Sequence, residues 1–130
     1  MKYVPHIVGA LLGLFFIMSA VMVLAGLAKP PADLKFTDEA LKFNEAMMPT
    51  GYMHLVKICE LIGGILVAIP KTRNFGLLLL GPIIVNIAAY HLFLQKDAFK
   101  TDTLVTLLIM GAMSLYLLWD ARAKFTALKN

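Results

Sequence analysis

Residues 50–69 read TGYMHLVKICELIGGILVAI, an apolar run whose only formally charged members are Lys57 and Glu60. The run has the length of about 20 residues that a helix needs to cross a bilayer core. A carboxylate at the middle of such a span costs roughly 3 kcal/mol on insertion scales, so it is usually paired or used by the protein. The run therefore predicts a membrane-spanning helix, and Glu60 within it is the first candidate functional residue.

Three further runs have the same character, at residues 4–28, 75–94 and 103–119, and the last is the shortest with 17 residues. The whole chain is 60% hydrophobic and 15% charged, with a mean hydropathy of +0.80, which is too apolar for a typical soluble domain. The sequence predicts one all-α membrane domain, residues 1–130, with four spans in an antiparallel four-helix transmembrane bundle.

The connection between the first two spans predicts a short amphipathic helix over residues 37–48. Thr37 is a suitable N-cap, and acidic residues follow it in the first turn, where the helix dipole favours negative charge. One helical face would carry the apolar side chains Phe36, Ala40, Phe43 and Met47. We expect this helix to lie flat on the membrane surface or over the mouth of the bundle.

Small residues and prolines indicate where the helices meet and bend. Gly9 and Gly13 form a GxxxG pattern, and the pair at residues 63–64 leaves a notch on the second span, so both predict close helix contacts. Pro82 lies inside the third span, where it removes a backbone donor and predicts a kink.

Charge gives the expected orientation and excludes one class of partner. Four spans place both termini on one side, and that side holds six Lys or Arg residues against five on the other. The positive-inside rule therefore favours cytoplasmic termini. The net charge of +4 is spread over loops and the tail rather than gathered in a patch, so nucleic acid is not an expected partner.

Membrane depth brings the polar residues of the second and third spans to matching levels. With a rise of about 1.5 Å per residue, Glu60 and Asn86 both lie roughly 15 to 17 Å from the nearer face. His54 and His91 both lie roughly 24 Å in, and Lys57 falls near Tyr90 between the two levels. The prediction is a polar column formed by His54, Lys57, Glu60, Asn86, Tyr90 and His91.

Rotation about the helix axes decides whether these six side chains can meet. His54, Lys57 and Glu60 are spaced by three, which places them within an arc of about 120°. Asn86 and Tyr90 are aligned, whereas His91 is turned by about 100° from Tyr90. The spacing therefore allows one shared face on the second span.

Two interpretations of the column remain open. In the first, Glu60 pairs with Lys57, Asn86 joins two helices by a hydrogen bond, and the network serves assembly alone. In the second, Glu60 exchanges protons with a bound ligand or along a proton path. The two carbonyl oxygens of a quinone would suit donors such as Lys57, Tyr90, Asn86 or His91. No compact metal-binding or hydrolytic motif is present, so we predict no metal site.

Two stretches carry a family resemblance: residues 51–64, GYMHLVKICELIGG, and residues 81–94, GPIIVNIAAYHLFL. Together with the end of the first span, SAVMVLAGLAK at residues 19–29, they resemble the DoxX family of small four-helix membrane proteins. The resemblance covers most of the chain, and the last span contributes little to it. Residue by residue, it points to Glu60 and to Asn86 and His91.

Membership of that family implies a bacterial inner-membrane protein. Some members are linked with redox systems, including a quinone-reducing thiosulfate oxidoreductase and partners that handle oxidative stress. We therefore expect a subunit or accessory of a quinone-linked membrane redox system, with quinone as the ligand and the bilayer, a redox partner subunit or a second copy as partners. The alternatives are a non-catalytic membrane scaffold and a carrier of protons or small solutes.

Overall fold

The computed structural model describes residues 2–29 and 32–129. Its elements confirm the all-α prediction, and no strand occurs in these two ranges. In chain order they are α1 (Val4–Leu24), α2 (Asp38–Met47), α3 (Tyr52–Ala68), α4 (Arg73–Ala89), the π-helical turn η1 (Tyr90–Leu94), α5 (Thr101–Asp120) and α6 (Arg122–Thr126).

The amphipathic helix forms where the sequence predicts it. Thr37 is its N-cap, and the Thr37 hydroxyl oxygen accepts a hydrogen bond from the Ala40 amide at 3.1 Å. Asp38 and Glu39 occupy the first turn. Ala40 is fully buried, so the predicted apolar face is the face that packs.

The second predicted span is shorter than expected. Its helix, α3, has 17 residues instead of the predicted 20. Gly51 takes a left-handed conformation with φ of 80° and turns the chain before the helix, and Ile69 is extended before Pro70. The helix therefore ends where the residue before a proline leaves the helical region.

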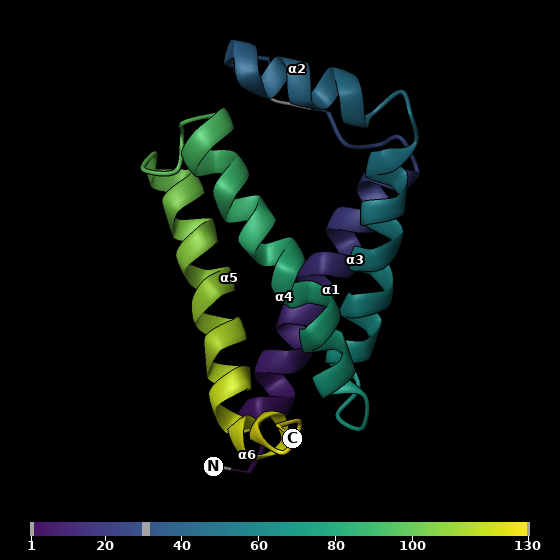
Figure 1. The fold of residues 1–130 in the computed structure, drawn as a ribbon, viewed down its shortest axis with the longest axis vertical. Helices are drawn as coiled ribbons and strands as arrows, with labels where there is room; N and C mark the ends of the chain where they lie inside the picture. The colour runs from purple at the N-terminus through teal and green to yellow at the C-terminus, as the bar shows by residue number, and fades with distance from the viewer. Residues whose placement is uncertain (1, 30–31, 130) are drawn as a thin grey trace.

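Figure 1 shows the arrangement of these elements. The N- and C-termini lie at one end of the molecule, and α2 lies across the other end. Beneath α2, the upper parts of α4 and α5 stand apart from those of α1 and α3, while the helices converge toward the terminal end. α2 meets α3 at 83° but packs against η1 rather than against α3.

The tightest helix contacts depend on glycine. A Cβ atom on Gly64 would lie 2.8 Å from the carbonyl oxygen of Gly13, so α1 and α3 touch backbone to backbone. A Cβ atom on Gly76 would lie 2.6 Å from the Val67 amide, which brings α4 equally close to α3. The first contact confirms Gly13 and Gly64 as predicted packing sites, whereas the contact at Gly76 was not predicted; both lie toward the terminal end of α3.

Within the part of the chain that the structure describes, three helices are long and apolar enough to cross a membrane: α1, α5 and the continuous stretch Arg73–Leu94. α3 reaches that length only when it is joined to α2 as one bent segment. The chain is therefore compatible with a multi-pass membrane protein. Two statements stay predictions: that the four helices form a closed bundle of four spans, and that residues 1–130 form a single domain.

Candidate functional site

A cavity of about 1250 Å³ lies beneath α2, between the diverging upper parts of the four long helices. Its wall includes Phe15 and Phe16 of α1, and Met110 of α5. The cavity follows from the packing below it, because the glycines that draw α3 and α4 together do not continue upward. Above that level the facing positions carry full-size side chains, such as Glu60 on α3 and Ile83 on α4.

Glu60 belongs to the α3 wall of the cavity and is 2% exposed. Its Oε2 atom accepts a hydrogen bond from Lys57 Nζ at 2.9 Å, as the sequence predicts for residues one turn apart. Lys57 Nζ also lies 3.4 Å from the Ser19 hydroxyl of α1. The charge pair therefore joins α3 to α1, and its two charges compensate each other within the wall.

Asn86 lies on the α4 wall of the same cavity, and its side chain is exposed to that space. Within residues 2–29 and 32–129, no protein group forms a hydrogen bond with the Asn86 side chain, so the predicted bond from Asn86 to the α3 wall is not formed. The depth count places Asn86 and Glu60 at one level, but depth carries no information on how far apart two helices stand. The amide is thus a free donor and acceptor facing an apolar space.

Tyr90 and His91 occupy η1, close to α2. The π-helical hydrogen bond runs from the Gln95 amide to the Tyr90 carbonyl at 2.9 Å. The Tyr90 hydroxyl accepts a hydrogen bond from Asn44 of α2 at 3.3 Å, and His91 Nδ1 lies 2.6 Å from an Asp97 carboxylate oxygen. Both rings contribute to the cavity wall, and both are held by partners outside α3.

His54 does not belong to the cavity wall and is exposed, so its predicted place in a polar column with Lys57 and Glu60 is wrong. Each step of three residues in an α-helix falls about 60° short of a full turn. Two steps turn His54 by about 120° from Glu60, which is enough to move it off the inner face. The structure brings together five of the six predicted residues around one space, and they line opposite walls rather than a continuous column.

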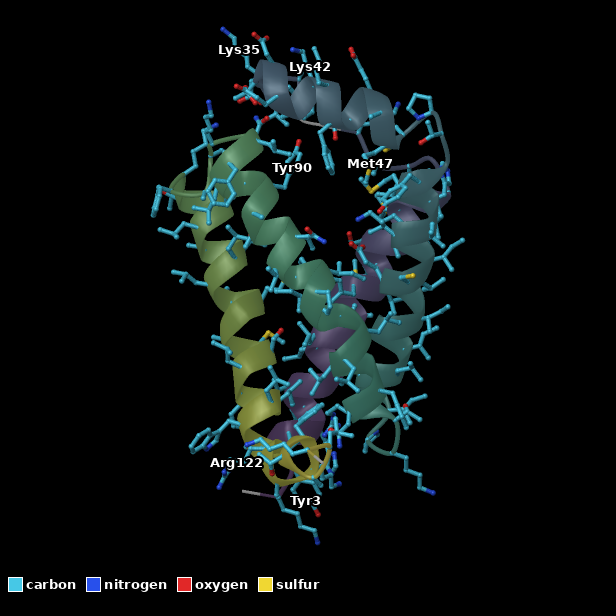
Figure 2. The ribbon with its side chains drawn as sticks, viewed as in Figure 1. Tyr3, Lys35, Lys42, Met47, Tyr90 and Arg122 are labelled. Carbon is cyan, nitrogen blue, oxygen red and sulfur yellow. The ribbon has the colours of Figure 1, made fainter. Side chains whose placement is uncertain are left out.

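The roof of the cavity is fixed to the α4 side by Gln95, which is 7% exposed. Its amide nitrogen donates to the Lys35 carbonyl at 2.8 Å, and its oxygen accepts from the Thr37 amide at 3.3 Å. The Thr37 hydroxyl donates to the Leu94 carbonyl. Figure 2 labels Tyr90 of η1 and Met47 of α2, and both line the cavity.

Sequence reasoning missed several polar residues: Ser19, Asn44, Asp102, Thr103 and Thr106 in the cavity wall, and Gln95 at its roof. Ser19 had a visible signal, because a hydroxyl within an uncharged span requires a partner. Asn44 lies four residues after Ala40 and so near the buried face of α2. Gln95 had no signal in the sequence, because the π-helical turn that positions it has no recognisable sequence pattern.

Metal binding finds no support in the described part of the chain, where no three His, Cys, Asp or Glu side chains gather. Cys59 is a free, half-buried thiol on α3.

Comparisons of this chain with known protein families, with characterised proteins and with solved structures find no match. Nothing in them bears on the resemblance to the DoxX family, which stays an expectation.

Proposed function

We propose that the chain is a DoxX-like multi-pass protein of the bacterial inner membrane whose cavity binds a lipid-soluble quinone for a membrane redox system. The observation that carries the proposal is a cavity of about 1250 Å³ with an apolar lining and polar groups on facing walls. Ligand sites of this kind are concave, mostly apolar and contain a few placed polar groups. In this proposal all four long helices span the bilayer, and the termini face the cytoplasm.

The polar groups match the chemistry of a quinone head group. A quinone offers two carbonyl acceptors on opposite sides of a ring, and the cavity offers the Lys57 ammonium on one wall and the Asn86 amide on the other. The Tyr90 hydroxyl lies nearer the roof and would be a third donor. Phe15 and Phe16 supply aromatic surface for the ring or the tail.

The Lys57–Glu60 pair suits proton exchange with such a ligand. Reduction of a quinone to a quinol takes two electrons and two protons, and the electrons come from a redox partner subunit. Glu60 lies in direct contact with Lys57, so after the ammonium group gives its proton to the reduced quinone, the Glu60 carboxylate can take up a proton from water and pass it to the neutral Lys57 amine. The chain thereby acts as the quinone-binding subunit of the system.

Substitution of Asn86 tests quinone binding most directly, because the Asn86 side chain forms no hydrogen bond within the described residues. Asn86→Leu keeps the size of the side chain and removes its donor and acceptor. We expect the Kd for decylubiquinone, measured by isothermal titration calorimetry in detergent, to rise about five- to tenfold, the value of one lost hydrogen bond. Asn74→Leu is the matched control, since it makes the same change at the other end of α4 and should leave the Kd unchanged.

A membrane scaffold is the second function that a specific observation favours. The Lys57–Glu60 pair, with its contact to Ser19, already satisfies the buried charge and joins two helices without any ligand. A pure scaffold would show no saturable decylubiquinone binding in the native chain. In that case Asn86→Leu would alter thermal stability alone, and the quinone proposal would be abandoned.

A further inference from the structure

A second hollow, of about 250 Å³, lies at the opposite end of the molecule from the large cavity. It is formed where the turn between α3 and α4 meets the junction of α5 and α6. Four charged residues line it, namely Lys71, Arg73, Asp120 and Lys124, together with the Asn74 amide. Both chain termini lie at this end.

Arg73 is the fixed element of this hollow. Its side chain is largely enclosed, and the residue is 8% exposed. The Nε atom donates to the Val67 carbonyl at 3.2 Å, and Nη2 lies 3.3 Å from His6 Nδ1. A Cβ atom on Gly9 would lie 2.5 Å from Nε, so this glycine is what makes room for the guanidinium.

No carboxylate among residues 2–29 and 32–129 forms an ion pair with Arg73, and the Asp120 carboxylate acts on its charge only from a longer distance. None of the ion pairs there, each with N···O of 4.0 Å or less, includes Arg73. Nη1 has no hydrogen-bond partner among the described residues. Every fully enclosed side-chain nitrogen or oxygen in these residues has a partner, so Nη1 is accessible to solvent. Arg73 lines the hollow, and a largely buried cation without an ion-pair partner favours a bound anion.

The rest of the lining selects the kind of anion. Lys71, Arg73 and Lys124 contribute three positive charges against the single negative charge of Asp120. A planar guanidinium binds phosphate through paired N–H groups, and lysines add point charges around it. Trp119 lies next to Asp120 in the chain, is 67% exposed and has the Arg122 guanidinium 4.4 Å from its ring, an arrangement typical of a membrane–water interface.

We propose that this hollow binds a phosphate group, carried by the headgroup of an anionic phospholipid or by a free phosphate ion. The site is separate from the quinone cavity and does not depend on the function proposed for it. Its position at the end that carries the termini places a lipid headgroup beside the α3–α4 turn. A phosphate held there would join that turn to α5 and α6.

Trp119 is the only tryptophan in the chain and directly precedes Asp120 of the hollow, so its fluorescence reports on lipid at this end of the molecule. The native chain is reconstituted in phosphatidylcholine with increasing amounts of phosphatidylglycerol brominated on its acyl chains, which quenches tryptophan. The test variant is Lys71→Gln with Lys124→Gln, because both side chains are exposed and form no hydrogen bond or ion pair within the described residues. The control is Lys35→Gln with Lys42→Gln, which removes the same charge at the α2 end, where Figure 2 labels both residues.

We expect brominated phosphatidylglycerol to quench native Trp119 at a lower mole fraction than brominated phosphatidylcholine. The Lys71/Lys124 variant should need at least about fivefold more phosphatidylglycerol, since each basic residue near a lipid surface contributes about that factor. The Lys35/Lys42 variant should match the native chain. Equal losses in both variants would show an effect of net charge alone and overturn the proposal.

Inorganic phosphate, added at matched ionic strength against chloride, separates the two sources of the phosphate group. Release of quenching by phosphate supports a site open to the free ion, and quenching that persists supports a lipid headgroup. If the two brominated lipids quench equally and phosphate also fails to raise the unfolding temperature of the native chain, the hollow binds no phosphate and the proposal is wrong.

Discussion

The Lys57 ammonium compensates the charge of the Glu60 carboxylate within an apolar helix. Glu60 is almost fully enclosed, and its partner lies one turn earlier at 2.9 Å. Removal of one member of a buried pair leaves an uncompensated charge, which typically costs 3–5 kcal/mol, whereas removal of both is far cheaper. Substitution of one residue and of both residues therefore distinguishes the effect of the charges from the effect of side-chain shape.

Lys57→Met should lower the free energy of unfolding by about 3 kcal/mol, because Glu60 loses its counter-charge. The double variant Lys57→Met with Glu60→Gln should recover most of that loss. The measurement is a double-mutant cycle by thermal or denaturant unfolding in detergent. Additive losses in the double variant would show that the two side chains do not act as a pair.

Gly13 gives a second prediction at this scale, because a methyl group there would collide with the backbone of Gly64. Gly13→Ala should destabilise the chain by about 1–3 kcal/mol, the usual cost of overpacking. Gly111→Ala is the matched control, since a Cβ atom there meets nothing within 4 Å. The Gly111→Ala control should leave the unfolding temperature unchanged or raise it, because alanine favours helix more than glycine does. A similar loss of stability in both variants would argue against a close contact between α1 and α3.

At the scale of the elements, α2 is the helix that the sequence predicts best and η1 the one it does not predict. The N-cap, the acidic first turn and the apolar face of α2 are local signals spread over a dozen residues, so they can be read without the rest of the molecule. The π-helical turn depends on how the end of α4 meets the loop before α5 and leaves no local pattern. The outward position of His54 was missed for a simpler reason. Residues spaced by three rotate progressively around the helix axis, so His54 does not stay on the face of Glu60.

Thr37→Ala should loosen α2, because Thr37 both caps the helix and donates to the Leu94 carbonyl. Loss of an N-cap costs about 1 kcal/mol, which corresponds to roughly fivefold faster opening of the helix. Hydrogen exchange should therefore quicken in residues 38–47 and stay unchanged in α1 and α3. Thr106→Ala, which removes a hydroxyl bonded within α5, is the control and should leave α2 exchange as it is.

At the scale of the whole molecule, tight packing at one end produces open space at the other. Glycines draw α1, α3 and α4 together toward the terminal end, and beneath α2 the α4 helix stands apart from α1 and α3. The sequence predicts the residues at both ends, and the depth count brings Glu60 and Asn86 to one level. It does not predict the cavity between them, because the separation of two helices depends on the side chains packed at every level below.

The proposed function requires that a quinone occupies this cavity rather than the outer surface of the helices. Photolabelling with an azido-quinone, followed by mass spectrometry of the labelled peptides, tests that claim most directly. We predict adducts on residues that line the cavity, such as Val56 and Ile87, and protection of these residues by excess decylubiquinone. Adducts confined to outward residues such as Leu55 and Val85, without protection, would contradict it.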